Sequence, residues 1–178
     1  MTKDIDPSYR IALLDAENSD DLQTFKSLKI NSLIDSPGAF HESLDEVMMY
    51  TEEEWKAALV EYPTSVLYSN GEPIGMGKFF PDPFDDIRWY RLGSFWVHPD
   101  HRGKGAADIL LADIIGQSVE AGIKRYETEG IESFGILLSI ARGNDRAGAF
   151  YSKHGFVADE SLRPPDFPWI VMVRPLSK

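Results

Sequence analysis

The chain has 178 residues, of which 43% are hydrophobic and 26% charged, and this ordinary globular composition excludes a disordered or low-complexity protein. It contains no cysteine, which excludes a disulfide scaffold, a cysteine nucleophile and thiolate metal sites and favours a reducing compartment. The formal charge of −11 lies entirely in residues 1–101, which hold 8 Lys and Arg against 19 Asp and Glu, so a cationic partner is favoured over nucleic acid.

The first predicted elements are a strand and two helices. Residues 9–15 are predicted to form a strand, and Asp20 with Gln23 is a plausible N-cap pair for a helix. Ser36-Pro-Gly38 breaks that helix, because proline and glycine both disfavour a helix interior. Thr51-Glu-Glu-Glu54 is a capping box, which predicts the start of a second helix.

A hairpin and a long strand come next. Asn70-Gly71 is the strongest short signal for a hairpin, and it lies between strands predicted at 65–68 and 73–80. The acidic, proline-rich segment 81–86 predicts a loop. Residues 87–97 then predict a long strand, which ends just before Pro99.

The second half of the chain predicts a crossover between two parallel strands. A helix is predicted from Gly105 to Ala121, with Gly122 as its stop signal. Residues 133–141 are apolar throughout, which is typical of a strand buried on both faces. A short helix from Asn144 to His154 and strands at 156–157 and 169–173 complete an α/β protein, a mixed sheet flanked by helices in a single domain over residues 1–178.

The turn between the long strand and the long helix, Arg102-Gly-Lys-Gly-Ala-Ala107, is the most informative segment. Its small residues expose backbone N–H groups at a helix N-terminus, where a diphosphate can bind, and Arg102 and Lys104 add positive charge. A Walker loop and a dinucleotide fingerprint both fit worse, because the glycine spacing differs and Asp108 would repel a pyrophosphate. A glycine-rich turn that binds nothing is the structural alternative.

Two motifs in register resemble those of the GNAT-type N-acetyltransferases. Val97-x-Pro-x-x-Arg-Gly-Lys-Gly-x-Ala107 is similar to the acetyl-CoA motif of that family. Asn144-x-x-Ala-x-x-Phe-Tyr-x-Lys-x-Gly-Phe156 is similar to its second signature, directly after the apolar strand. The resemblance is firm over about residues 92–157 and implies the GNAT acyl-CoA N-acyltransferase fold with a cofactor-binding core there. Members of this family often form homodimers, so a homodimer is an expected assembly.

The resemblance also implies a reaction and its residues. An acetyl group would pass directly from acetyl-CoA to a primary amine within a ternary complex. Tyr151 would protonate the departing CoA thiolate; without the resemblance it would be interpreted as a core aromatic residue. The backbone after Ser94 would pair with pantetheine and polarise the acetyl carbonyl. The implied cofactor-binding residues are Phe95, Trp96, Val97, Arg102, Gly103, Lys104, Gly105, Ala106, Ala107, Asn144, Ala147, Phe150 and Lys153.

The group that would deprotonate the acceptor is not at its usual place. An alkylamine of pKa about 10.4 is protonated at pH 7, and deprotonating it costs about 4.6 kcal/mol. Many family members have a glutamate about six residues before the valine of the first motif, and here that residue is Arg91. The candidate replacements are Asp85, Asp86, Glu42 and a water relayed by Ser94. An acceptor amine of low pKa and a non-catalytic acyl-CoA-binding domain are the alternatives.

The expected partners are acetyl-CoA, with CoA as product, and a cationic amine acceptor such as a polyamine, an amino sugar or a peptide. Neither a membrane, nucleic acid nor a metal is expected, and the polar N-terminus predicts a cytoplasmic protein without a signal peptide. His98 and His101 span Pro99 in a turn and are interpreted as loop residues rather than metal ligands. The expected walls of the acceptor pocket are Phe84, Phe167 and Trp169.

Overall fold

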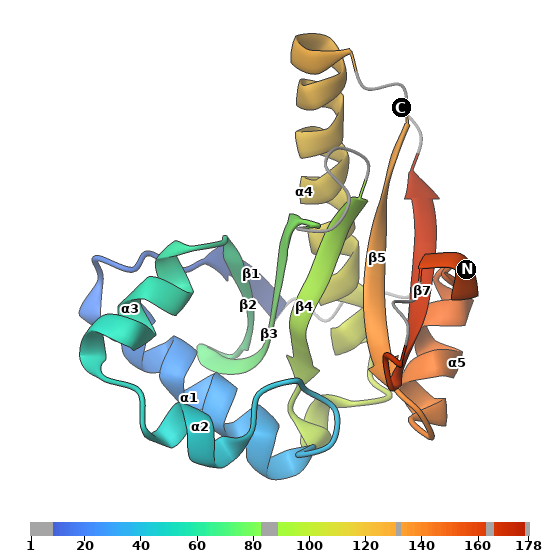
Figure 1. Ribbon diagram of the computed structural model, residues 1–178. Coiled ribbons are helices and arrows are strands. Elements are labelled where there is room, and N and C mark those ends of the chain that lie inside the picture. Colours follow the sequence, from blue (N-terminus) through green and yellow to red (C-terminus); the bar gives the residue numbers. More distant parts are fainter. Residues whose placement is uncertain (1–8, 83–88, 131–132, 163–165, 177–178) are drawn as a thin grey trace. The chain divides into compact units, whose positions relative to one another are not determined.

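The computed structural model describes residues 9–82, 89–130, 133–162 and 166–176, and its strands form a seven-stranded mixed sheet, as predicted (Figure 1). The strands are β1 (Tyr9–Leu13), β2 (Thr64–Ser69), β3 (Glu72–Pro81), β4 (Trp89–Val97), β5 (Phe134–Ala141), β6 (Val157–Ala158) and β7 (Trp169–Leu176), in the order β1-β2-β3-β4-β5-β7-β6. The helices are α1 (Ser19–Asp35), α2 (Leu44–Met48), α3 (Glu52–Val60), α4 (Ala106–Glu129) and α5 (Asp145–Lys153). Within the described ranges, no helix is long and apolar enough to cross a bilayer.

The chain divides into two compact units. The first unit is Met1–Phe79 with Ser94–Ile114, and the second unit is Phe80–Gly93 with Ile115–Lys178. Strand β4 and helix α4 each contribute residues to both units. The single domain over residues 1–178 stays a prediction.

Local capping signals explain the helices of the first unit. The predicted N-cap at Asp20 is wrong by two residues, because the Asn18 side chain accepts hydrogen bonds from the backbone N–H groups of Asp20 and Asp21. The predicted capping box of α3 is confirmed: the Thr51 and Glu54 side chains each bond the other's backbone N–H. Helix α2, which has five residues, was not predicted from the sequence, although it has a capping box of its own.

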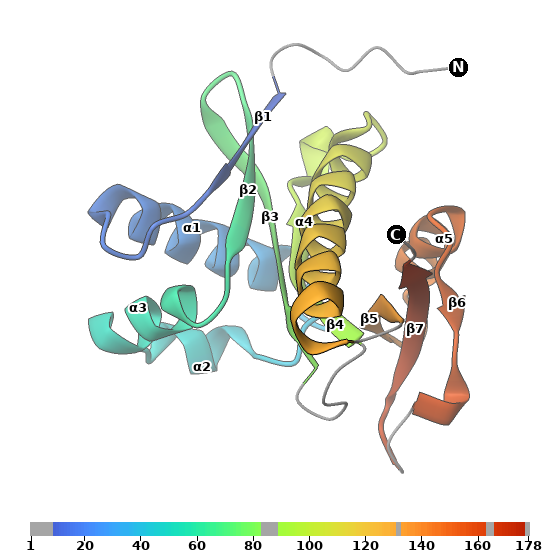
Figure 2. The same ribbon diagram turned by 90° about the horizontal axis from the view of Figure 1, so that it is seen from above.

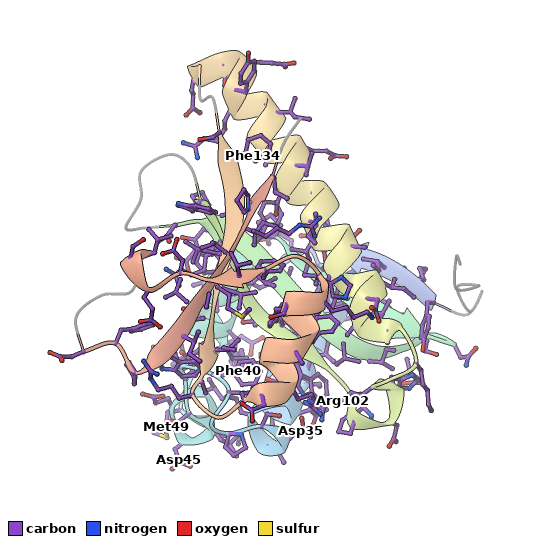
Figure 3. The ribbon with its side chains drawn as sticks, turned by 90° about the vertical axis from the view of Figure 1, so that its right-hand side faces the viewer. Asp35, Phe40, Asp45, Met49, Arg102 and Phe134 are labelled. Atoms are coloured by element: carbon purple, nitrogen blue, oxygen red, sulfur yellow. The ribbon has the colours of Figure 1, made fainter. Side chains whose placement is uncertain are left out.

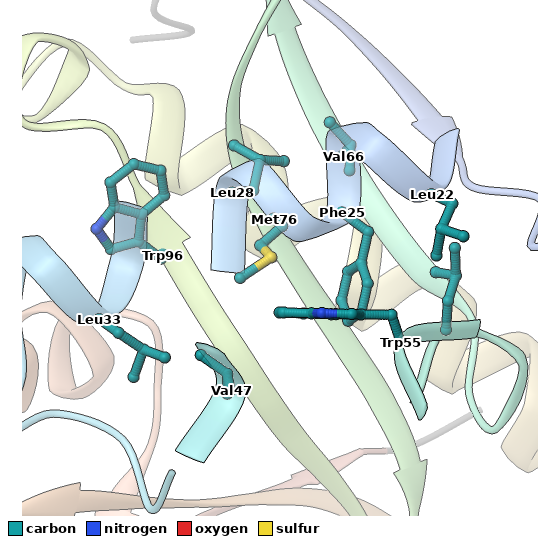
Figure 4. Close-up of a cluster of buried hydrophobic side chains, with 10 residues drawn as sticks. Leu22, Phe25, Leu28, Leu33, Val47, Trp55, Val66, Met76 and Trp96 are labelled. Atoms are coloured by element: carbon teal, nitrogen blue, oxygen red, sulfur yellow. The ribbon is translucent and has the colours of Figure 1, made fainter. Parts of the chain in front are cut away.

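The hairpin and the core of the first unit follow from the sequence pattern. Asn70 and Gly71 have φ angles of 51° and 89°, so both turn residues adopt the left-handed conformation that a primed hairpin turn requires. Helices α1 and α3 lie side by side next to β2 (Figure 2). Between them and the strands, an apolar cluster forms the core (Figure 4). Its buried members are Leu22, Phe25, Leu28, Leu33, Val47, Trp55, Leu59, Val66, Met76 and Trp96.

The structure contains the predicted parallel crossover. Strand β4 pairs in parallel with β5 through Trp89–Arg91 and Gly135–Leu137, and α4 connects the two strands. Strand β5 pairs antiparallel with β7 along its whole length. Its first five residues are all buried, which confirms the prediction of a strand covered on both faces. Helix α5 lies beside β7 (Figures 1 and 2).

The predicted end of the long helix is wrong. Helix α4 continues past Gly122 to Glu129, and Gly130, with φ 71°, follows its last residue. Gly122 is a packing residue instead, because a Cβ atom there would lie 2.3 Å from ring atoms of Phe134. The glycine lets the first residue of β5 approach the helix backbone closely.

We therefore expect opposite effects from alanine at two glycines of α4. Gly116→Ala should stabilise the protein by about 0.5 to 1 kcal/mol, because alanine favours helix and a Cβ there meets no atom within 4 Å. Gly122→Ala should destabilise it by about 1 to 3 kcal/mol, because Phe134 must move to make room. Urea unfolding of both variants measures the difference. Equal stability would show that the contact with Phe134 does not require glycine.

Candidate functional site

The turn between β4 and α4 has a backbone that only glycine adopts easily. After a short 3-10 helix at Pro99–His101, Gly103 and Gly105 have φ angles of 73° and 91°. A Cβ at either glycine would meet nothing within 4 Å, so the backbone conformation, not packing, requires them. The Ile109 N–H donates to the Gly105 carbonyl at 3.1 Å and begins the bonding of α4. The first N–H groups of a helix have no acceptor within it, so this turn can receive an anion.

The strand that leads to this turn is distorted just before it. Ser94 has φ 51°, a left-handed conformation that costs a non-glycine residue about 1 to 2 kcal/mol. Strained residues of this kind concentrate at functional sites. The three residues after Ser94 complete β4; Trp96 and Val97 are buried and Phe95 is half-buried. The distortion therefore falls at the backbone for which the sequence predicted contacts with pantetheine.

Arg102 is fixed by an acidic partner that the sequence analysis missed. Its guanidinium forms an ion pair with Asp35, at the end of α1, and donates from Nε to the Val97 carbonyl at 2.8 Å. The Trp96 Nε1–H donates to the same Asp35 carboxylate at 2.9 Å. Figure 3 labels Asp35 and Arg102 at this contact. The charge of Arg102 is thus balanced by Asp35, whereas Lys104 is exposed on the turn.

The Asp35 carboxyl is ionised because of this network. Its burial would by itself raise its pKa, and this is the largest single influence. Hydrogen bonds from Arg102, Trp96 and Ser36 outweigh burial and lower the pKa of Asp35 to about 2. The Asp35 carboxylate is therefore ionised at neutral pH and available to pair with Arg102.

The second motif lies on α5 in the second unit. The Asn144 side-chain oxygen accepts from the Ala147 N–H at 3.2 Å and so caps the helix, which begins where the sequence predicted it. Along the helix, Ala147 and Phe150 are half-buried and Lys153 is exposed. Capping by Asn144 orients the first turn of α5 and occupies its side-chain oxygen.

Tyr151 is buried among aromatic rings. Its ring lies 5.3 Å from that of Phe150 and 5.5 Å from that of Phe156, both nearly edge-on. Burial raises the pKa of the Tyr151 phenol above its ordinary value of 10.0. The phenol is consequently protonated at neutral pH and can act as a proton donor, and it also packs as a core residue.

Arg91, which stands where many family members have a glutamate, forms an ion pair with the buried Asp82. Arg91 donates from NH2 to both carboxylate oxygens of Asp82, at 3.3 and 3.1 Å, and from NH1 to Ser139 Oγ at 3.3 Å. Only 4% of the Asp82 side chain is exposed, against 22% of Arg91. Asp82 is not among the residues predicted from the sequence, although an arginine in a central strand needs a nearby carboxylate to offset its desolvation.

The candidate bases occupy different surroundings. Asp85 and Asp86, like Phe84, lie outside the described residues. Glu42 pairs with the ammonium of the buried Lys29 at 2.5 Å. Ser94 stands at the distorted point of β4.

The remaining predicted residues are packed. Phe167 packs against an apolar cluster of the second unit formed by Leu137, Val171 and Val173, and Trp169 begins β7. The His98 ring lies edge-on to those of Trp96 and His101, at 5.9 and 6.2 Å. In the described part of the chain, no group of three or more His, Asp or Glu side chains could hold a metal ion.

Removing the partner of Arg91 should destabilise the protein. Asp82→Ala leaves a mostly desolvated guanidinium without its carboxylate, which costs about 3 to 5 kcal/mol in a fully buried pair. Because Arg91 keeps some exposure to solvent, we expect about 2 kcal/mol by urea unfolding. The double variant Asp82→Leu, Arg91→Met, which removes both charges, should recover most of this loss. No recovery would show that the charge pair is not the cause.

Comparisons with known proteins give the site its context. The family model described as Acetyltransferase (GNAT) family matches residues 30–156. An L-amino acid N-acyltransferase of Escherichia coli (strain K12) is 38% identical over 76 residues, which are 42% of this chain and 44% of that protein. An L-methionine sulfoximine/L-methionine sulfone acetyltransferase of Salmonella typhimurium is 37% identical over the same length, again 42% of this chain and 44% of that protein. The matched region thus spans less than half of either relative.

Solved structures show the same fold. The PaiA N-acetyltransferase of Thermoplasma acidophilum, solved in complex with coenzyme A, has a TM-score of 0.63 at 20% identity, covering 95% of this chain and 99% of that one. A GNAT-family acetyltransferase of Staphylococcus aureus Mu50 has a TM-score of 0.66 at 17% identity, with coverages of 95% and 99%. The family model covers most of the chain and both sequence motifs, and the chain therefore belongs to the GNAT acetyltransferase family.

Proposed function

We propose that this acetyltransferase binds the pyrophosphate of acetyl-CoA at the Arg102–Ala107 turn and transfers the acetyl group directly to a primary amine. The observation that carries the proposal is the pair of left-handed glycines at the start of α4, where the backbone exposes N–H groups to an anion. Lys104 adds positive charge at the same turn. The strained Ser94 supports the placement of pantetheine along Phe95–Val97.

The proposed chemistry assigns each group one step. The amine nitrogen attacks the thioester carbon, and backbone N–H groups after Ser94 stabilise the oxyanion. The carbon–sulfur bond then breaks, and Tyr151 donates its proton to the CoA thiolate. Asn144, Ala147, Phe150 and Lys153 would line the cofactor along α5. With no cysteine in the chain, a cysteinyl acyl-enzyme does not form.

The proposed acceptor is an α-amine of a small molecule or peptide. Both curated relatives carry names of enzymes that acylate amino acids or their analogues. An α-amino group has a pKa of about 7.7 to 8.0 in a peptide, so its deprotonation at pH 7 costs about 1 kcal/mol. A peptide acceptor with such an amine needs less help from a base than an alkylamine does, which fits an arginine at position 91. The charge of residues 1–101 supports a cationic member of the class.

The remaining assignments belong to the same proposal. Asp85, or a water relayed by Ser94, would take the amine proton. A cytoplasmic location and a homodimer stay predictions.

Calorimetric titration with acetyl-CoA, followed by a thiol-release screen over amines, tests the function. We expect saturable binding of acetyl-CoA and CoA and faster turnover of α-amines than of alkylamines. Binding without turnover of any amine would favour the non-catalytic acyl-CoA-binding domain. Failure of the folded protein to bind either ligand would refute the proposal.

A further inference from the structure

We infer that Asp35 is a positioning residue for the cofactor: it holds Arg102 so that the turn presents backbone N–H groups, rather than the arginine charge, to the pyrophosphate. This inference rests on the proposed binding of acetyl-CoA at the turn. Asp35, Trp96 and Arg102 belong to the first unit, and hydrogen bonds connect all three.

The network joins three separate segments at one carboxylate. Asp35 is the last residue of α1, Trp96 lies near the end of β4, and Arg102 begins the turn. Arg102 NH1 donates to Asp35 Oδ1 at 3.3 Å, and NH2 bonds Oδ2. With its Nε on the Val97 carbonyl, the guanidinium uses all three of its nitrogens and has a fixed orientation.

Asp35 lies at the C-terminal end of α1, where a carboxylate by itself destabilises the helix. A carboxylate at a helix C-terminus opposes the helix dipole, and α1 has no basic residue in its last turn to offset it. The compensation comes from Arg102, 67 residues away in sequence. The contact therefore offsets the charge of Asp35 at the helix end and at the same time fixes the arginine that begins the turn.

The two glycines of the turn contribute no side-chain contacts that would fix its shape. Gly103 and Gly105 have no side chains, and their Cα atoms face open space. Glycine samples more backbone conformations than any other residue, so an unanchored turn would lose entropy when it closed around a phosphate. Anchoring Arg102 on both Val97 and Asp35 removes part of that cost before the ligand arrives.

Removing the charge of Asp35 should change the affinity for acetyl-CoA in the direction opposite to the one that charge alone predicts. Asp35→Asn removes a negative charge near a site for a polyanion, which by charge alone should tighten binding. If Asp35 instead positions the turn, the same substitution should weaken binding of both acetyl-CoA and CoA by about tenfold. The Michaelis constant for acetyl-CoA should rise in parallel, while that for the amine changes less than twofold.

A second variant separates position from charge. Arg102→Lys keeps the charge but loses the planar fork that grips Asp35 and Val97, so it should weaken binding as much as Asp35→Asn. Both substitutions break the same network. The double variant Asp35→Asn, Arg102→Lys should therefore bind acetyl-CoA no more weakly than whichever single variant binds it less tightly. Glu52→Gln is the matched control, since Glu52 is a carboxylate of the same unit that pairs with Lys26 of α1. It should bind acetyl-CoA like the wild type.

Titration calorimetry of the wild type and these four variants, with folding checked by circular dichroism, tests the inference. Weaker binding by Asp35→Asn, with unchanged binding by Glu52→Gln, is the expected result. Equal or tighter binding by Asp35→Asn would overturn the inference while leaving the proposed function intact. If Asp35→Asn does not fold, wild-type affinity in Arg102→Lys would overturn it equally. Absence of binding by the wild type would instead refute the proposed function.

Discussion

Replacing Tyr151 with phenylalanine is expected to lower kcat about 100- to 1000-fold while leaving the affinity for acetyl-CoA unchanged. The substitution removes only the hydroxyl, and the edge-on contacts of the ring with Phe150 and Phe156 are retained. Loss of the proton donor forces the CoA thiolate to leave unprotonated. Steady-state kinetics and calorimetry on the same preparation measure the two quantities.

The pH dependence of kcat gives an independent check. Tyr151 must be protonated to act as an acid, so its contribution would be lost only as the pH rises through its pKa. Burial raises that pKa above 10.0, so the wild-type kcat should not fall between pH 7 and 9. The Tyr151→Phe variant should show a profile of the same shape at a lower level, because the phenol does not titrate in this range.

Tyr90→Phe is the matched control. Tyr90 is buried to a similar degree in the same unit, so its variant tests the loss of a buried hydroxyl as such. It should retain a kcat within a fewfold of the wild type. If the Tyr151→Phe enzyme had the wild-type kcat, Tyr151 would be a core aromatic residue and not the proton donor.

Several features encoded by neighbouring residues were predicted correctly, although the N-cap of α1 was misplaced and the capping box of α2 was missed. The Asn70-Gly71 hairpin and the Thr51 capping box involve residues at most three apart, so their patterns are visible in the sequence. The end of α4 was misplaced because Gly122 is required by Phe134, and no local signal distinguishes a packing glycine from a stop.

In the candidate site too, contiguous motifs could be predicted and contacts between distant residues could not. The glycine turn and the α5 motif could be predicted because each is a contiguous pattern. Asp35 could not, because its link to Arg102 spans 67 residues and nothing around Asp35 indicates a cation partner. Asp82 is only nine residues from Arg91, yet choosing it among the acidic residues of its loop required knowing which one is buried. Tertiary contacts thus determine how charges at the site are balanced.

Glutamate at position 105 is expected to weaken acetyl-CoA binding about 1000-fold, equivalent to about 4 kcal/mol. Gly105 has φ 91°, and a Cβ there faces open space at the proposed phosphate position. A carboxylate at this point repels the diphosphate and competes with it for the backbone N–H groups. Part of the loss will come from backbone strain, since a residue with a Cβ rarely adopts this conformation.

Two further variants separate these causes. Gly105→Ala has the strain without the charge and should weaken binding only about tenfold. Gly116→Glu adds the same charge to an exposed position further along α4 and should bind like the wild type. Binding of Gly105→Glu as tight as that of Gly105→Ala would place the pyrophosphate elsewhere. The expected order of affinity, with the glutamate variant far below the alanine variant, instead supports an anion near Gly105, and in acetyl-CoA the diphosphate supplies that charge.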